Sequence, residues 1–216
     1  KKKKKEKKLE YEPLVIDIKM ETGTGKTYCY TRMMYELHKE YGFNKFIILV
    51  PSTPIKEGTK NFILSDYSKE HFNDIYKESY LKLEVLNAIK NSKKGRKMFP
   101  QSISDFARGS SLEKKRINCL LMTDKMLLSK PTMGNEYDQV LFGNYTIPYD
   151  VLKNVRPIVI IDEPHRFKEE NKAYNRLLEK IEPLAIVRFG ATFPKKEKSD
   201  ETDYKNLIYN LNSVEA

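Results

Sequence analysis

A short glycine-rich turn near the amino end constrains the fold of this chain more than any other feature. Apolar residues over Leu14–Lys19 predict a β-strand, and apolar residues at helical spacing predict a helix over Lys26–Glu40. The turn between them, Met20–Thr27, reads Met-Glu-Thr-Gly-Thr-Gly-Lys-Thr. Glycines let such a turn curl so that backbone N–H groups and the positive end of the helix surround a phosphate. The sequence therefore predicts an α/β fold with a nucleotide-phosphate site at this turn.

The turn supplies a complete set of candidate phosphate and metal ligands. Lys26 is expected to contact the β and γ phosphates of ATP, and the hydroxyl of Thr27 is expected to bind Mg²⁺. The residues expected to hold the nucleotide are Thr22, Gly23, Thr24, Gly25, Lys26 and Thr27. The full phosphate-loop pattern begins with Gly where this chain has Met20, so the match is incomplete there. The alternative is a plain glycine turn before a helix, which the retained Gly-x-Gly-Lys-Thr core disfavours.

A second candidate site follows the apolar strand predicted at Ile158–Ile161. Asp162 and Glu163 come directly after it, and ligands bind at the carboxyl ends of strands in an open parallel sheet. Asp162 is expected to hold Mg²⁺, and Glu163 to orient or deprotonate the attacking water. With Lys26 they form the predicted catalytic set. Acids after a strand are often only turn formers, but these supply the half of a magnesium site that the glycine turn lacks.

Alternating strand and helix patterns predict the rest of the fold. A helix is expected at Thr53–Leu64. Further strands are expected at Phe46–Val50, Leu81–Ala88, Cys119–Thr123 and Ala185–Phe189. The repeated order of strand and then helix predicts a mostly parallel sheet flanked by helices on both faces.

The expected organisation is one nucleotide-binding lobe at 13–194, preceded by a basic arm or boundary segment at 1–12. Surface insertions are expected near 90–101, which is basic, and near 129–148, which is rich in Pro, Gly and Asn. The residues 195–216 are expected to begin a linker, with a weak helix at Tyr204–Leu211.

Charge and cysteine usage restrict the function only loosely. The net charge is +10, but the first eight residues hold seven lysines and one glutamate, so the body carries only +4. Such a balance favours nucleic-acid binding modestly. Cys29 and Cys119 are expected to be buried free thiols in a reducing cytoplasm, and they give no metal-ligand spacing. No run of 18 apolar residues occurs, so no membrane span is expected.

Three motifs together resemble those of superfamily 2 helicases and translocases. Asp162–His165 resembles the Asp-Glu-x-His box, Gly190–Thr192 the Ser/Gly-Ala-Thr box, and Val50–Lys56 the motif that follows the second strand onto DNA. The amino-acid sequences of these motifs are most similar to those of the restriction (Res) subunit of type III restriction enzymes, and the resemblance covers most of Leu14–Phe193. The resemblance implies a RecA-like P-loop NTPase lobe of a DNA-translocating ATPase that uses ATP and Mg²⁺.

The resemblance also implies roles for residues outside the glycine turn and the two acids. It assigns the coupling of hydrolysis to movement to His165, Ala191 and Thr192. It assigns DNA contacts to Pro51, Thr53 and Lys56. For His165 the alternative is a hydrogen-bonded structural histidine.

The resemblance implies several partners as well. These are double-stranded DNA, a modification methyltransferase subunit, and a second RecA-like lobe and a nuclease domain of the same full-length chain. We expect this lobe to be part of a larger protein and to hydrolyse ATP slowly alone, because arginine fingers come from the second lobe. Another superfamily 2 motor, such as a repair helicase or a type I restriction motor, is an alternative. A non-motor P-loop ATPase or kinase is the third possibility, and salt-sensitive DNA binding separates it from the motors.

Overall fold

The computed structural model describes residues 11–88, 98–109, 113, 115–167, 172–196 and 199–211. Most of the predicted basic arm, and residues 90–97 of the first predicted insertion, lie outside these residues. None of the helices in the described part is long and apolar enough to cross a membrane.

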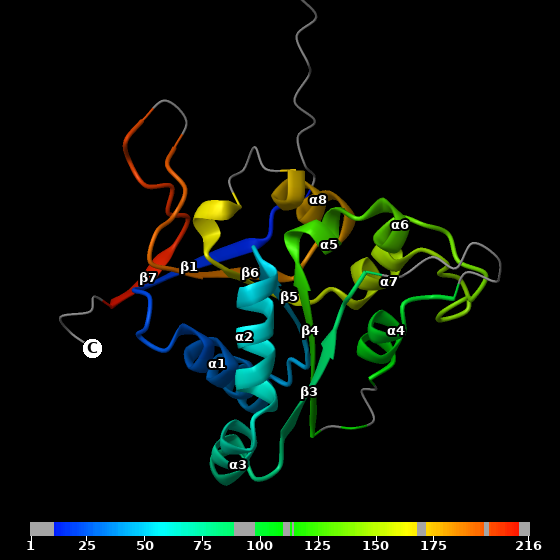
Figure 1. Ribbon diagram of the computed structural model, residues 1–216, viewed down its shortest axis with the longest axis horizontal. Coiled ribbons are helices and arrows are strands. Elements are labelled where there is room, and N and C mark those ends of the chain that lie inside the picture. Colours follow the sequence, from blue (N-terminus) through cyan, green and yellow to red (C-terminus); the bar gives the residue numbers. More distant parts are fainter. Residues whose placement is uncertain are drawn as a thin grey trace, which may run out of the picture.

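A single sheet of seven strands, each parallel to its neighbours, organises the described part of the chain (Figure 1). Its strands are β1 (Leu14–Met20), β2 (Lys45–Val50), β3 (Tyr80–Val85), β4 (Arg116–Thr123), β5 (Ile158–Asp162), β6 (Ala185–Gly190) and β7 (Leu207–Leu211). Their spatial order is β3-β4-β2-β5-β6-β1-β7. β6 therefore lies between the strand that leads into the glycine turn and the strand that ends in Asp162. The register pairs Lys19 with Gly190 and Asp162 with Phe189, so these three strands end nearly level.

Helices cover both faces of the sheet (Figure 1). The helices on one face are α1 (Lys26–Tyr41), α2 (Thr53–Leu64) and α3 (Asp66–Ile75). On the other face are α4 (Gln101–Arg108), α5 (Asp124–Leu128), α6 (Lys130–Met133), α7 (Pro148–Val155) and α8 (Lys172–Lys180), and a short 3₁₀ helix, η1 (Pro164–Arg166), follows β5. The predicted fold class, a parallel α/β sheet flanked on both faces in the RecA-like arrangement, is confirmed.

The period-2 alternation of β2 separates two hydrophobic cores. Ile47 and Leu49 pack with the α4–α8 layer, whereas Ile48 and Val50 pack with the α1–α3 layer. A strand covered on both faces needs apolar residues at consecutive positions, and for that reason the continuous run at Phe46–Val50 predicts it correctly. α1 ends where expected, because Gly42 adopts a left-handed backbone and its N–H donates to the carbonyl of His38.

The segment 129–148, expected to be a surface insertion, has several buried side chains, and whether it is an insertion stays a prediction. Met133 and Leu141 are fully buried, and Tyr137 is nearly so, within the core of the α4–α8 layer. These three side chains anchor a segment whose other apolar residues include Val140 and Phe142, which are exposed. In the other predicted insertion, Phe99 is buried and α4 begins at Gln101, so its described end also belongs to the core.

The expectation of a weak helix at Tyr204–Leu211 is wrong. Leu207–Leu211 instead forms β7, which pairs in parallel with β1 at the edge of the sheet. Whether the residues 195–216 begin a linker to a second lobe stays a prediction.

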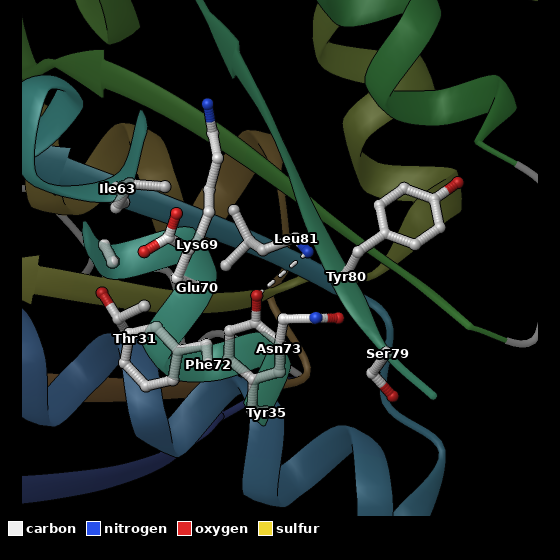
Figure 2. A pocket seen from close by; sticks show the side chains of 11 residues that line it. Thr31, Tyr35, Ile63, Lys69, Glu70, Phe72, Asn73, Ser79, Tyr80 and Leu81 are labelled. Carbon is white, nitrogen blue, oxygen red and sulfur yellow. Dashed lines mark hydrogen bonds between the residues drawn. The ribbon is translucent and has the colours of Figure 1, made fainter. Parts of the chain in front are cut away.

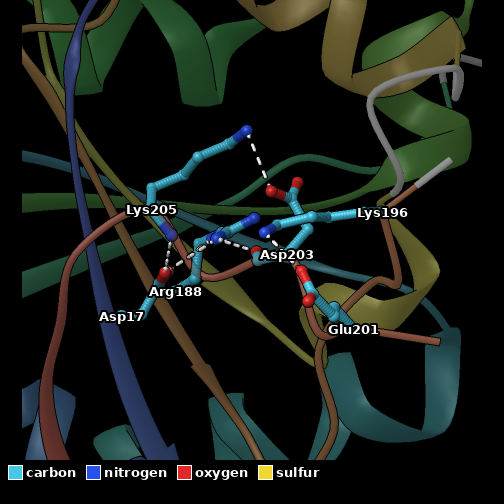
Figure 3. Close-up of polar contacts among 6 residues, drawn as sticks. All are labelled: Asp17, Arg188, Lys196, Glu201, Asp203 and Lys205. Carbon is cyan, nitrogen blue, oxygen red and sulfur yellow. Dashed lines mark hydrogen bonds and ion pairs between the residues drawn. The ribbon is translucent and has the colours of Figure 1, made fainter. Parts of the chain in front are cut away.

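A buried ion pair explains why this segment becomes a strand (Figure 3). Arg188 and Asp17 are 1% and 0% exposed, and the guanidinium donates to both carboxylate oxygens at 2.6 and 2.8 Å. Arg188 also donates to the carbonyl of Asp203, and the backbone N–H of Lys205 donates to Asp17. These contacts hold the chain just before β7 against β1, and so override a weak local preference for helix.

Candidate nucleotide site

The glycine turn has the backbone geometry that a phosphate cradle requires. Gly23 and Gly25 have φ values of 88° and 87°, in the left-handed region that glycine adopts without steric cost. The hydroxyl of Thr24 donates to the carbonyl of Glu21 at 2.6 Å and closes the turn. The 16-residue helix α1 begins immediately afterwards at Lys26, so its positive end faces the turn.

Met20 explains why the first glycine of the pattern is dispensable here. It is the last residue of β1, it is buried, and it is not among the described residues with positive φ. Its side chain packs in the core beneath α1. A position with ordinary strand backbone does not need glycine, so the departure leaves the cradle intact.

Asp162 presents a carboxylate oxygen that no described residue satisfies. The residue is 5% exposed at the end of β5, and its Oδ1 has no hydrogen-bond partner within the described part of the chain. Burial raises the pKa of Asp162 to about 6, and the nearby charge of Lys26 opposes this shift. A carboxylate oxygen without a protein partner is suited to bind Mg²⁺, directly or through water, so the predicted metal ligand fits its site. The described residues contain no cluster of three or more His, Cys, Asp or Glu side chains that could bind a metal by themselves.

Lys26 and Glu163 form an ion pair across the sheet edge. The ammonium donates to Oε1 of Glu163 at 2.7 Å, and the side chains are 9% and 19% exposed. Glu163 has a left-handed backbone with φ 59°, and its N–H donates to the carbonyl of Phe189 on β6. A left-handed non-glycine residue directly after a strand turns the chain sharply. The structure thus brings the glycine turn and both acids to one place.

A chain of polar contacts continues from this pair to the Gly-Ala-Thr segment. Oε2 of Glu163 lies 3.4 Å from Nδ1 of His165, which lies 3.0 Å from the hydroxyl of Thr192. Gly190 permits the approach, because a Cβ at this position would lie 2.4 Å from Cδ of Pro164. Ala191 is partly exposed between Gly190 and Thr192. The three residues expected to couple hydrolysis to movement therefore lie beside the acids.

The residues expected to contact DNA differ in how exposed their side chains are. Thr53 is exposed at the start of α2, and Pro51 is partly exposed just before it. Lys56, by contrast, is only 7% exposed, and its ammonium donates to Oδ1 of Asn87 at 2.7 Å. Lys56 could therefore contact DNA only after its ammonium leaves Asn87.

A pocket of about 300 Å³ lies between the glycine turn, the start of α2 and the residues that follow β5. Its lining residues are Thr22, Pro51, Ser52, Ile55, Glu163, His165 and Arg166. Ser52 and Arg166 were not among the predicted site residues. Their place in the chain, next to two of the motifs, is the signal that could have indicated them.

A larger cavity of about 420 Å³ lies elsewhere, between α1, α3 and the beginning of β3 (Figure 2). Tyr35, Phe72 and Leu81 supply much of its apolar wall, and none of its lining residues belongs to the predicted site. Strand β3 begins at this end, whereas the candidate site lies where strands finish. This cavity is therefore larger than the pocket beside the glycine turn but lies away from the candidate site.

The fold is that of the P-loop NTPases, with β6 inserted between the strand that leads to the glycine turn and the strand that ends in the acid pair. The family model described as the type III restriction enzyme Res subunit matches residues 3–195. The chain belongs to this family.

Curated relatives agree with this assignment. The chain is 46% identical over 210 residues to the Res subunit of the type III restriction-modification enzyme StyLTI from Salmonella typhimurium. The match covers 93% of this chain and 21% of that protein. The EcoP15I Res subunit of Escherichia coli and the EcoPI Res subunit of Escherichia phage P1 are each 44% identical over 94% of this chain and 20% of their own length. The chain spans about a fifth of the relatives that it matches. Among solved structures, the Sulfolobus solfataricus SWI2/SNF2 ATPase core in complex with double-stranded DNA is 13% identical with a TM-score of 0.44, over 83% of this chain and 28% of that one.

Proposed function

We propose that this chain is the ATP-binding motor lobe of a type III Res subunit, in which hydrolysis of Mg-ATP drives movement along DNA. The observation that carries the proposal is the convergence of Lys26, Asp162 and Glu163 beside a left-handed glycine turn at the start of α1. Membership of the Res family supports the assignment to a restriction system.

Nucleotide binding would rearrange the ion pair. The amides of the glycine turn and the positive end of α1 would surround the triphosphate, and Lys26 would leave Glu163 for the β and γ phosphates. Thr27 and the unpaired oxygen of Asp162 would hold Mg²⁺, which supplies positive charge against the phosphate oxygens.

The residues around the acids suggest how hydrolysis would proceed. Glu163, once separated from Lys26, would orient or deprotonate the attacking water. A change at Glu163 would reach Thr192 through His165, which contacts both side chains. Arginine fingers would come from a second lobe, so the lobe alone would hydrolyse ATP slowly.

The remaining partners follow from the family and from the exposed segment beside the site. Double-stranded DNA would contact Pro51 and Thr53, with Lys56 available only if it leaves Asn87. A modification methyltransferase subunit would select the recognition site, and a nuclease domain of the full-length chain would cut the DNA. A reducing cytoplasm suits the free thiols Cys29, which is partly exposed, and Cys119, which is buried.

ATP turnover with and without DNA tests this function. The complete gene product should hydrolyse ATP faster when double-stranded DNA is added, and a Lys26→Ala variant should bind and hydrolyse Mg-ATP poorly. The 216-residue chain alone should bind Mg-ATP but turn over slowly. Turnover by the isolated chain at the rate of the complete product, unaffected by DNA, would overturn the proposal.

Two alternatives have distinct signatures. Another superfamily 2 motor, such as a repair helicase or type I restriction motor, would share the site but would lack a neighbouring type III methyltransferase gene. A non-motor P-loop ATPase would bind nucleotide without any salt-dependent affinity for DNA, because phosphate contacts release counterions.

A further inference from the structure

Lys56 lies on the inner face of α2, although the residues just before it are open to solvent. Thr53 is exposed and Pro51 is partly exposed, whereas Lys56 is only 7% exposed. With Thr59 and Ile63 it forms the buried face of α2, at the spacing of three and four residues that a helix places on one side. The helix therefore directs this lysine away from the surface expected to contact DNA.

The ammonium of Lys56 joins two segments that leave different strands. Its Nζ donates to Oδ1 of Asn87 at 2.7 Å, and Asn87 follows β3, whereas α2 follows β2. Strand β4 lies between β2 and β3, and α2 packs against both β3 and β4 (Figure 1). The loop that carries Asn87 is held to the sheet by the N–H of Leu86, which donates to the carbonyl of Leu121 on β4. The lysine side chain thus ties the start of α2 to a loop that is itself fixed to the sheet.

The surroundings of Lys56 favour keeping this contact when DNA binds. Its aliphatic stem is buried together with Thr59 and Ile63, so swinging the ammonium outward would expose apolar surface and leave a gap under α2. A hydrogen bond from an ammonium is also stronger than one between neutral groups. A DNA phosphate would therefore meet the exposed first turn of α2 before it reached this ammonium.

We propose that Lys56 and Asn87 are positioning residues: their hydrogen bond holds the start of α2, with Pro51 and Thr53, in the place where DNA binds, and Lys56 itself touches no phosphate. The inference rests on the proposed function and replaces the direct DNA contact expected of Lys56 with an indirect role. It also adds Asn87, which none of the motifs indicated, to the residues that determine DNA affinity.

Salt dependence distinguishes a positioning lysine from one that contacts DNA. Each lysine that neutralises a DNA phosphate releases counterions, and it contributes about 0.9 to the slope of log affinity against log salt concentration. A lysine that only holds α2 contributes nothing to this slope. Its loss should weaken binding by the same factor at every salt concentration.

The test measures the affinity of the complete gene product for a fluorescently labelled DNA duplex at several salt concentrations. Lys56→Met keeps much of the buried stem and removes the ammonium, and Asn87→Ala removes the acceptor. Each should weaken binding by at least about fivefold, the lower end of the usual range for coupling between sites, and should keep the wild-type slope. The double variant should bind no more weakly than the weaker single variant, because both changes remove the same contact.

Lys60→Met is the matched control. Lys60 lies about one turn further along α2, and its ammonium is 3.2 Å from Oε2 of Glu57, with both side chains partly exposed. This variant should bind DNA like the wild type. Asn87 is exposed, so Asn87→Ala should fold even if Lys56→Met does not. Lys56→Arg keeps a donor and should retain most of the wild-type affinity.

The outcomes separate this inference from the function on which it rests. A slope that falls by about 0.9 in Lys56→Met, with wild-type affinity in Asn87→Ala, shows a direct phosphate contact; it overturns the inference but leaves the motor function standing. Equal weakening in Lys60→Met and Lys56→Met shows a general effect of charge on α2 and also overturns the inference. Wild-type protein without any salt-dependent affinity for DNA refutes the proposed function, and the inference with it.

Discussion

The ammonium of Lys26 lies 2.7 Å from the carboxylate of Glu163, although the two residues are 137 positions apart in the sequence. The lysine expected to hold the phosphates is thus paired with the acid expected to activate water. Neither can take up its proposed role while the pair is closed. Phosphate oxygens that draw Lys26 away would therefore also release Glu163.

Glu163→Gln should separate nucleotide binding from hydrolysis. Glutamine keeps the size of the side chain but can neither accept a proton from water nor hold Lys26 as an ion pair. ATP turnover should fall at least about 100-fold, the lower range for loss of a general base, while Mg-ATP binding is retained. Steady-state turnover and fluorescence titration measure the two effects. Glu179→Gln, at an exposed position on α8, is the control, and turnover near the wild-type rate in Glu163→Gln would contradict the assignment.

Gly190→Ala should disturb the turn that carries His165. Its new methyl group would lie 2.4 Å from Cδ of Pro164 and 3.1 Å from the carbonyl of Thr192, so one of these must move. Stability should fall by about 1–3 kcal/mol, as in other overpacked sites, and DNA-stimulated turnover should fall with it. Gly58→Ala is the matched control, because no atom lies within 4 Å of its added Cβ and it sits inside α2.

Urea unfolding distinguishes the two glycine variants, because their free energies of unfolding should change in opposite directions. Gly58→Ala should stabilise the protein by about 0.5–1 kcal/mol through helix propensity. A Gly190→Ala variant as stable as wild type would show that the Pro164 turn is not tightly packed.

Removing either partner of the buried Arg188–Asp17 pair should be strongly destabilising. Each single change leaves an uncompensated buried charge, which costs about 3–5 kcal/mol. Arg188→Met and Asp17→Asn test this by urea unfolding, and the double variant should recover part of the loss. The exposed pair Lys195–Asp200 is the contrast, since Lys195→Met should change stability by less than about 1 kcal/mol. Equal small effects at both pairs would contradict the structural role of Arg188.

Lys45→Met should loosen the end of α4. The ammonium of Lys45 donates to the carbonyls of Phe106, Ala107 and Gly109, and so satisfies the carboxyl end of that helix from β2. Methionine fills similar space but offers no donor, and buried carbonyls left unpaired cost about 1–3 kcal/mol. Hydrogen exchange should accelerate in α4 and remain unchanged in α3, and uniform exchange in both helices would refute this role.

The sequence predicts the inner strands and the site edge for simple physical reasons. A strand buried on both faces requires a continuous apolar run, as at Phe46–Val50 and Ile158–Ile161. Parallel strands finish at one edge, so motifs that directly follow strands must converge. This logic places the glycine turn, Asp162 and Gly190 together without any knowledge of strand order.

Contacts between distant side chains explain what local patterns do not reveal. Strand β7 depends on Asp17 and Arg188, which come from two other strands. Lys56 looks like a DNA-contact residue by position, but Asn87, on the loop after β3, engages its ammonium. The hydroxyl link from Tyr30 to Thr59 likewise requires two helices to be packed before it exists.

Strand β7 makes β1 an inner strand of the sheet instead of an edge strand. Without it, β1 would be the border of the sheet, with one row of backbone groups open to water. With β7 in place, the strand that feeds the glycine turn is hydrogen-bonded along both sides. Fraying that starts at this edge must therefore separate β7 from β1 before it reaches Met20, so Leu207–Leu211 protect the strand that leads into the glycine turn from local opening.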